Sequence, residues 1–106
     1  METQQNPEQA VIIYFNYGIQ GLGPLHKLEK KLEQVIKDNK LGEYDGHEIA
    51  MDYSDGTLYM YGPDAEILFN AIKPALQASE FMKGAKALLS FGPSDENTKE
   101  IEVDLE

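Results

Sequence analysis

Cysteine and arginine are both missing from this chain of 106 residues. Without cysteine there is no disulfide, no thiolate nucleophile and no cysteine-based zinc or iron–sulfur site. Without arginine there is no planar guanidinium, the group that holds phosphates and carboxylates through two parallel hydrogen bonds. These absences exclude enzymes with a cysteine nucleophile and proteins with cysteine-bound metals, and they disfavour sites that hold phosphate through arginine.

Positive charge and long apolar runs are scarce as well. Nine lysines stand against nineteen acidic residues, which gives a formal net charge of −10. Because phosphate contacts dominate the affinity for nucleic acids, we expect neither DNA nor RNA as a partner. No run approaches the about 18 apolar residues of a membrane helix, and the polar start of the chain lacks the pattern of a secretory signal. We therefore expect no membrane contact and a cytoplasmic location.

The hydrophobic content of 42% is ordinary for a globular protein, and a chain of this length forms one core. We expect a polar N-terminal tail over residues 1–9 and a single domain over residues 10–106. The charge is uneven within it. Residues 25–40 hold five lysines and three acids, whereas residues 41–72 hold seven acids and no lysine. Such acidity favours solubility, and it also attracts basic partners.

Residues 10–17 predict a buried central strand, because β-branched and aromatic side chains fill the run between Pro7 and Gly18. Aliphatic residues then recur at helical spacing from Leu25 to Ile36, behind a proline suited to a first turn. This pattern predicts an amphipathic helix that ends before Gly42.

The segment Ser54-Asp55-Gly56-Thr57 predicts a two-residue hairpin turn, because Asp-Gly accepts the positive φ angles of such turns. In that register the expected strand partners are Met51 with Met60, Asp52 with Tyr59, and Ala50 with Tyr61. The apolar face of the hairpin would then carry Ile49, Met51, Tyr53, Leu58 and Met60. The other face would carry Ala50, Asp52, Tyr59 and Tyr61.

The residues Gly62-Pro63-Asp64 are typical of a helix start. The second helix that they predict would bury Ile67, Leu68, Ala71, Ile72, Ala75 and Leu76. Residues 86–91 and 101–105 predict two further strands, with a turn at residues 92–95 between them.

The predicted order is β-α-β-β-α-β with one more strand at the C-terminal end. This order predicts an α+β fold, the ferredoxin-like split βαβ plait, with both helices on one face of the sheet. Right-handed crossovers would place the strand of residues 10–17 between the strands of residues 57–62 and 86–91.

Four segments resemble a group of small, functionally uncharacterised bacterial proteins: residues 42–48 (GEYDGHE), 58–65 (LYMYGPDA), 72–76 (IKPAL) and 91–93 (FGP). The resemblance covers roughly residues 10–105. It implies a stand-alone cytosolic ferredoxin-like domain of bacterial origin, and it implies no activity and no site residues.

Candidate chemical sites are weak in this sequence. Asp45, His47 and Glu48 could contribute to a metal site, but Asp45-Gly46 is also typical of a turn between a helix and a strand. No serine lies in a nucleophile motif, and the glycines of residues 18–23 lack the spacing of a phosphate-binding loop. We expect no metal, no cofactor and no catalytic residue.

The face of the sheet opposite the helices is the strongest candidate for function. We expect it to carry Tyr14, Asn16, Tyr59 and Tyr61, with Glu48 and Asp52 at its margin. Tyrosine supplies a large contact area and a hydroxyl at low entropic cost, which is typical of protein interfaces. The candidate partners are another protein or a second copy of the chain.

Three functional hypotheses follow from this face. The first is a non-enzymatic interaction module that binds a basic protein, for example a toxin that it neutralises. The second is a ligand-sensing regulatory plait, and the third is a cofactor-free dimeric plait enzyme with an apolar substrate. A deep pocket at Tyr14, Tyr59 and Tyr61 would favour the second or third, and a flat face the first.

Overall fold

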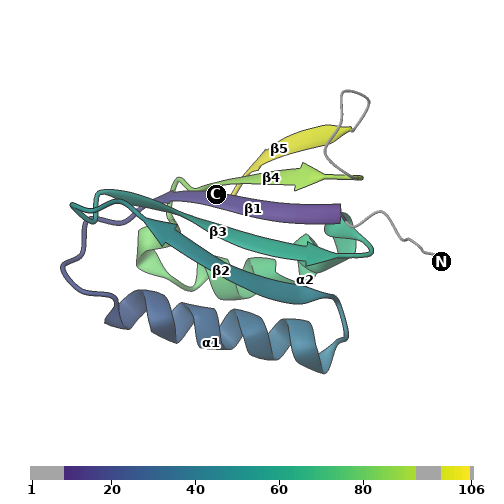
Figure 1. The fold of residues 1–106 in the computed structure, drawn as a ribbon, viewed down its shortest axis with the longest axis horizontal. Helices are drawn as coiled ribbons and strands as arrows, with labels where there is room; N and C mark the ends of the chain where they lie inside the picture. Colours follow the sequence, from purple (N-terminus) through teal and green to yellow (C-terminus); the bar gives the residue numbers. More distant parts are fainter. Residues whose placement is uncertain (1–8, 93–98, 106) are drawn as a thin grey trace.

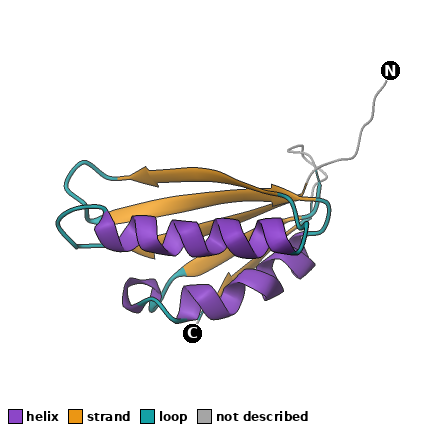
Figure 2. Ribbon diagram, turned by 90° about the horizontal axis from the view of Figure 1, so that it is seen from below, coloured by secondary structure: helices purple, strands orange, loops and turns teal. Residues whose placement is uncertain are grey.

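A computed structural model describes residues 9–92 and 99–105 of the chain. It is an α+β structure in which a five-stranded antiparallel sheet carries two helices on one of its faces (Figures 1 and 2). The elements in chain order are β1 (Gln9–Asn16), α1 (Gly23–Asp38), β2 (Glu43–Ile49), β3 (Asp55–Gly62), α2 (Ala65–Gln77), the short 3₁₀ helix η1 (Glu80–Met82), β4 (Lys86–Ser90) and β5 (Glu100–Asp104). The expected tail lies outside the described residues except for Gln9, and the expected turn at residues 92–95 is described only at Gly92.

The strand order is β2-β3-β1-β4-β5, so β1 is the central strand and pairs with both β3 and β4. This placement confirms the neighbours predicted for residues 10–17. The strand was predicted to be buried, but it is fully buried only on the helix side, because Tyr14 and Asn16 on its other face are exposed. No helix of the described residues is long and apolar enough to cross a membrane.

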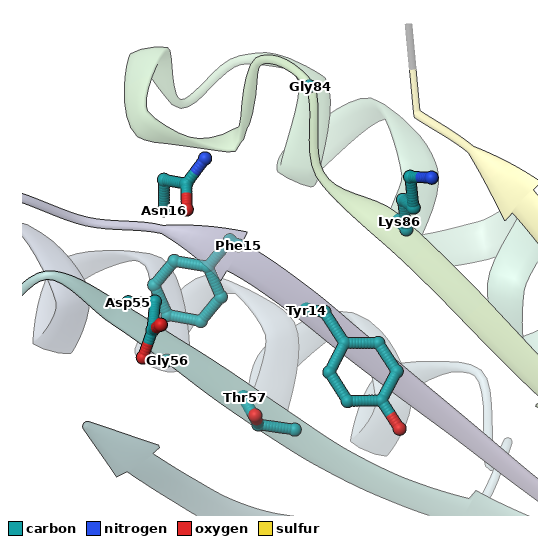
Figure 3. A pocket seen from close by; sticks show the side chains of 8 residues that line it. All are labelled: Tyr14, Phe15, Asn16, Asp55, Gly56, Thr57, Gly84 and Lys86. Atoms are coloured by element: carbon teal, nitrogen blue, oxygen red, sulfur yellow. The ribbon is translucent and has the colours of Figure 1, made fainter. Parts of the chain in front are cut away.

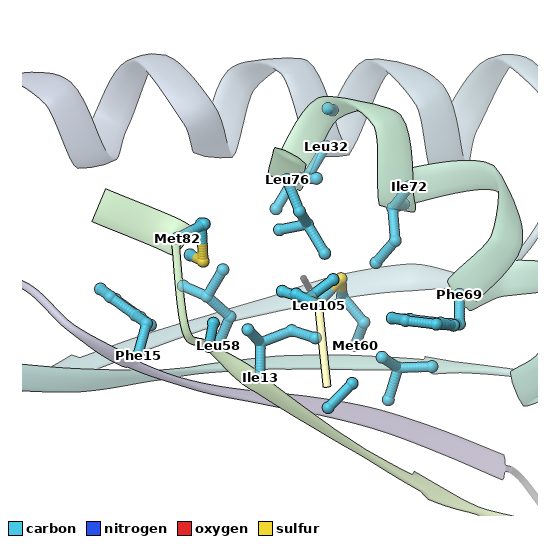
Figure 4. Packing of buried hydrophobic residues seen from close by; sticks show 14 of the residues in the cluster. Ile13, Phe15, Leu32, Leu58, Met60, Phe69, Ile72, Leu76, Met82 and Leu105 are labelled. Carbon is cyan, nitrogen blue, oxygen red and sulfur yellow. The ribbon is translucent and has the colours of Figure 1, made fainter. Parts of the chain in front are cut away.

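The core lies between the sheet and the helices (Figure 4). Val11, Ile13 and Phe15 of β1 point toward the helices and are buried, as are Leu58 and Met60 of β3. The register places Ile13 opposite Leu58, so both strands contribute the same face to the core. Helix α1 buries Leu25, Leu28, Leu32 and Ile36 against this face.

Helix α2 begins at Ala65, two residues later than Gly62-Pro63 predicted, and its cap is Asp64, whose side chain accepts a hydrogen bond of 3.1 Å from the backbone N–H of Ile67. The predicted core face of the helix needs two corrections, because Ile67 and Ala71 were both expected to be buried, and Ala71 is only half-buried. Ile67 is 54% exposed, whereas Phe69 is 4% exposed. The buried positions form a single stripe at helical spacing that does not include Ile67. They are Ala65, Leu68, Phe69, Ile72, Ala75 and Leu76.

The predicted Asp-Gly turn is wrong. The chain turns at residues 50–54, where the N–H of Tyr53 donates 2.8 Å to the carbonyl of Ala50, and Tyr53 itself takes a positive φ of 61°. Gly56 instead lies inside β3, opposite Phe15 and Ile49. A Cβ at this position would stand 2.5 Å from Ile49 Cδ1 and 2.8 Å from Phe15 Cζ. Gly56 is therefore required by close packing and not by turn geometry.

The shifted turn moves the residues of β2 relative to the prediction. Met51 was expected in the core, but it lies in the turn and is fully exposed. Asp52 was expected opposite Tyr59 and lies in the same turn. The observed partners of Tyr61, Tyr59 and Thr57 are Glu43, Gly46 and Glu48.

Candidate functional site

The face of the sheet opposite the helices is called the open face here. Its side chains follow from the strand register, which aligns three rows across all five strands. In the order β2, β3, β1, β4, β5, the rows are Glu43, Tyr61, Ala10, Ser90, Glu100; Gly46, Tyr59, Ile12, Leu88, Glu102; and Glu48, Thr57, Tyr14, Lys86, Asp104. Asp55 and Asn16 pair at the end of β3 and β1.

The centre of the open face is aromatic and aliphatic. Tyr14 is 44% exposed, and Ile12, Tyr59, Tyr61 and Leu88 are half-buried. The three tyrosines share this face, while Met60, Ile13 and Phe15 lie on the helix side as the alternation of the strands predicted. The centre of the open face thus presents five large side chains whose outer surfaces are accessible.

Both edges of the open face are acidic. Strand β2 contributes Glu43 and Glu48, and strand β5 contributes the three acids of its outward positions, Glu100, Glu102 and Asp104. Lys86 is the only cationic side chain in the three rows of described residues. The tyrosines therefore lie between two negatively charged strands.

A hydrogen bond connects the acidic edge to the centre. The hydroxyl of Tyr59 donates to Glu48 Oε1 over 2.9 Å. This bond to the carboxylate raises the pKa of Tyr59 above its usual value. The same bond holds the ring of Tyr59 beside β2.

The remaining predicted site residues lie apart from this centre. Asn16 is exposed at the end of β1. Asp52 does not belong to the open face, because its Oδ1 accepts a hydrogen bond of 3.0 Å from the N–H of Ser54 within the turn. Hydrogen bonds from Ser54 lower the pKa of Asp52 below its usual value. Glu48 does lie at the margin as expected, and the second acid there is Glu43 instead of Asp52.

A cavity of about 350 Å³ opens at the Asn16 end of this face (Figure 3). Tyr14 and Asn16 of β1, Asp55 and Thr57 of β3, and Lys86 of β4 contribute to its lining. Tyr14 is the one tyrosine of the three that reaches it. The cavity is therefore a hollow at the Tyr14 end of the open face and does not lie beneath Tyr59 and Tyr61.

A second cluster of polar side chains joins β2 to α1. Glu29 Oε2 lies 2.7 Å from His47 Nδ1 and also accepts a hydrogen bond from the hydroxyl of Tyr44. Burial and the bond to Glu29 raise the pKa of Tyr44 far above its usual value. The ring of His26 lies 6.2 Å from that of His47. Across residues 9–92 and 99–105, no three His, Cys, Asp or Glu side chains are arranged to hold a metal.

This cluster corrects the interpretation of Asp45 and Gly46 as a turn. Both lie within β2, and the register shifts between Tyr44 and Gly46, so that Asp45 is the extra residue of a β-bulge. Residues three apart on a regular strand point to opposite faces. The bulge is what brings both Tyr44 and His47 to the α1 side, where they hold Glu29.

Comparisons of the chain with models of known families, with curated proteins and with solved structures found no match in any of the three. Function is therefore inferred from the geometry and charge of the molecule alone.

Proposed function

We propose that this protein is a non-enzymatic interaction module that binds a basic protein through its open face. The observation that carries the proposal is the group of tyrosine and aliphatic side chains at the centre of the open face, which lies between two acidic strands, β2 and β5. Desolvated tyrosines supply most of the affinity in many interfaces, while charges at the rim accelerate and orient association. The two parts of the face thus have separate roles in binding.

The charge pattern favours a basic partner over a second copy of the chain. When two open faces stack, the acidic strands of one copy meet those of the other, because β2 and β5 are acidic at both edges. A rotation of one copy about the axis through the faces changes which strands meet, but both faces keep an excess of acidic side chains. With Lys86 as the one cation in the three rows, a second copy offers too little positive charge to compensate.

The cavity beside Tyr14 is the observation that would favour a ligand-sensing plait or a cofactor-free plait enzyme. It lies at the Tyr14 end of the open face. Its polar lining comes from Asn16, Asp55, Thr57 and Lys86. An apolar substrate held under Tyr59 and Tyr61 would need a cavity there. The interaction module remains the better supported function.

We further propose the ferredoxin-like plait as the fold, in a cytosolic protein of bacterial origin. The strand order β2-β3-β1-β4 and the alternation of strands and helices support the fold, and β5 extends the sheet beyond β4. The resemblance of residues 42–48 and 58–65 to small bacterial proteins supports the origin.

Affinity capture with three versions of the protein tests this function. The wild type, the double variant Tyr59→Ala/Tyr61→Ala and the control Ile67→Ala are used at low and high salt with a bacterial lysate. Ile67 is exposed on α2, on the other side of the molecule, so the control also removes exposed apolar surface. We expect a protein of high isoelectric point that the wild type and the control retain at low salt and that the tyrosine variant loses.

Two results would contradict the proposal. One is capture of the same proteins by all three versions, which would place binding elsewhere. The other is recovery of only a second copy of the chain in a manner insensitive to salt, which would make the open face a homodimer interface.

A further inference from the structure

A groove lies on the helix side of the molecule, where the first turns of α1 face the end of α2 and η1. Its volume is about 440 Å³, within the range of small-molecule sites. Ile19, Leu28, Ala75 and Phe81 give it an apolar lining. Because the sheet separates α1 and α2 from the open face, the groove is independent of the interaction surface (Figure 2).

The floor of the groove is held in place by aromatic packing. The ring of Phe81 meets that of Tyr17 edge to face at 5.2 Å between centroids, and it lies 5.7 Å from Phe15. Phe15 and Tyr17 are themselves buried in the core. The apolar wall is therefore formed before a ligand arrives, which lowers the entropic cost of binding.

Two lysines line the mouth of this groove. Lys27 and Lys31 are separated by one turn of α1, so their side chains lie on the same face of the helix. Among the residues that the structure describes, no carboxylate oxygen lies within 4.0 Å of either ammonium nitrogen. In a chain of net charge −10, these two lysines make the mouth of the groove locally positive.

The start of α1 adds to the positive potential. Pro24 lines the groove in the first turn, that turn holds no acidic residue, and no side chain caps the helix at Leu22. The N-terminal end of a helix carries a partial positive charge that favours anions. Glu80 is the one acidic residue of the lining, so it and the two lysines leave a net charge of one positive unit.

From this arrangement we infer that the groove binds a small amphipathic monocarboxylate. The apolar body of the ligand lies against Leu28, Ala75 and Phe81, and its carboxylate lies between the ammonium groups of Lys27 and Lys31. A single negative charge matches the net charge of the lining. An apolar cation is disfavoured by the same two lysines.

The test uses decanoate as the probe, below the concentration at which it forms micelles, and the ¹⁵N-labelled full chain. Backbone amide shifts are followed by NMR for the wild type, for Lys27→Gln/Lys31→Gln, and for the control Lys30→Gln/Lys37→Gln. The control removes the same charge from the same helix but outside the groove. Decan-1-ol and decyltrimethylammonium serve as neutral and cationic probes of equal chain length.

We expect decanoate to shift the amides of Ile19, Lys27, Ala78 and Phe81 and to bind about fivefold more weakly to Lys27→Gln/Lys31→Gln, with the control variant unchanged. Decan-1-ol should bind more weakly than decanoate, and the cationic probe weakest of all. Equal affinity of the lysine variant and the wild type, equal affinity of decanoate and the cationic probe, shifts outside the groove, or no binding of decanoate would each overturn the inference.

Discussion

The hydroxyl of Tyr59 donates a hydrogen bond to the carboxylate of Glu48, and this bond of 2.9 Å links the aromatic centre of the open face to its acidic edge. A partner that breaks this hydrogen bond must supply the Glu48 carboxylate with another hydrogen-bond donor, because an unpaired carboxylate in an interface costs binding free energy. A lysine of a basic protein can satisfy Glu48 without breaking the bond. The geometry thus favours a cationic group at this margin.

The roles of charge and aromatic contact can be separated by kinetics. In Glu43→Lys/Glu102→Lys both acidic edges are altered while the hydrogen bond between Tyr59 and Glu48 is kept, so association with the captured partner should slow several-fold and depend less on salt. In Tyr59→Ala/Tyr61→Ala the dissociation rate should rise about tenfold or more, because truncated aromatic contacts act mainly on dissociation. Stopped-flow measurements at two salt concentrations give both rates. An unchanged salt dependence in the charge variant would remove the electrostatic role.

The packing of Gly56 predicts a stability change with a specific rescue. Gly56→Ala places a Cβ against Ile49 and Phe15 and should lower the free energy of unfolding by about 1–3 kcal/mol. Replacing Ile49 by Val removes the Cδ1 atom that lies nearest, so Gly56→Ala/Ile49→Val should recover part of the loss. Urea unfolding gives the free energies. Gly23→Ala, where no atom lies within 4 Å of the new Cβ, is the control.

A methionine pair tests the strand register. Met60 is buried under the helices, and Met60→Ala should cost about 2–5 kcal/mol of unfolding free energy. Met51 is fully exposed in the turn, and Met51→Ala should change that free energy by less than about 0.5 kcal/mol. The register that the Asp-Gly pair predicted would make both changes costly. Thermal or urea unfolding of the two variants therefore distinguishes the two registers.

Tyr44 predicts a pH dependence at the alkaline side. Its pKa is raised in the folded protein by burial and by the hydrogen bond to Glu29, whereas in the unfolded chain it ionises near pH 10. The stability that this hydroxyl contributes is therefore fully present below about pH 10 and is lost as the pH rises further. Tyr44→Phe should cost about 1 kcal/mol at pH 7.

The difference between the wild type and Tyr44→Phe should then shrink above about pH 10, because only the wild type loses stability by ionisation of this phenol in the unfolded state. Urea unfolding of both proteins at pH 7, 9, 10 and 11 measures the difference. A difference that stays constant over this range would show that the pKa of Tyr44 is not raised in the folded protein.

Much of the architecture could be predicted from local patterns. The apolar run of residues 10–17 identified the central strand, and the alternation at Leu58, Tyr59 and Met60 assigned the faces of β3 correctly. These signals are strong because burial imposes a period of two on a strand and excludes polar side chains from its inner face.

The turn between β2 and β3 could not be predicted in the same way. Asp55-Gly56 has the composition of a hairpin turn, yet the glycine serves the packing of Phe15 and Ile49, and the residue with positive φ is Tyr53. A tertiary contact thus decided the position of the turn over local propensity. Neither Met51 nor Asp52 could then be placed correctly.

The cluster of Glu29, Tyr44 and His47 was missed for a related reason. Tyr44 and His47 share a face only because of the bulge at Asp45, and no local signal separates such a bulge from a turn.

The acidic charge of the open face was predicted only in part. The acids of β5 reach this face through the pairing of β5 with β4, which the alternation of residues 101–105 allowed but did not specify.

The proposal that the open face binds a basic protein is tested most directly by NMR mapping of the labelled chain with the captured partner. The account predicts that the amide shifts of Tyr14, Tyr59 and Tyr61 and the methyl shifts of Ile12 and Leu88 change, and that these changes weaken as salt is added. Changes confined to α1 and α2, with the open face unaffected, would contradict it.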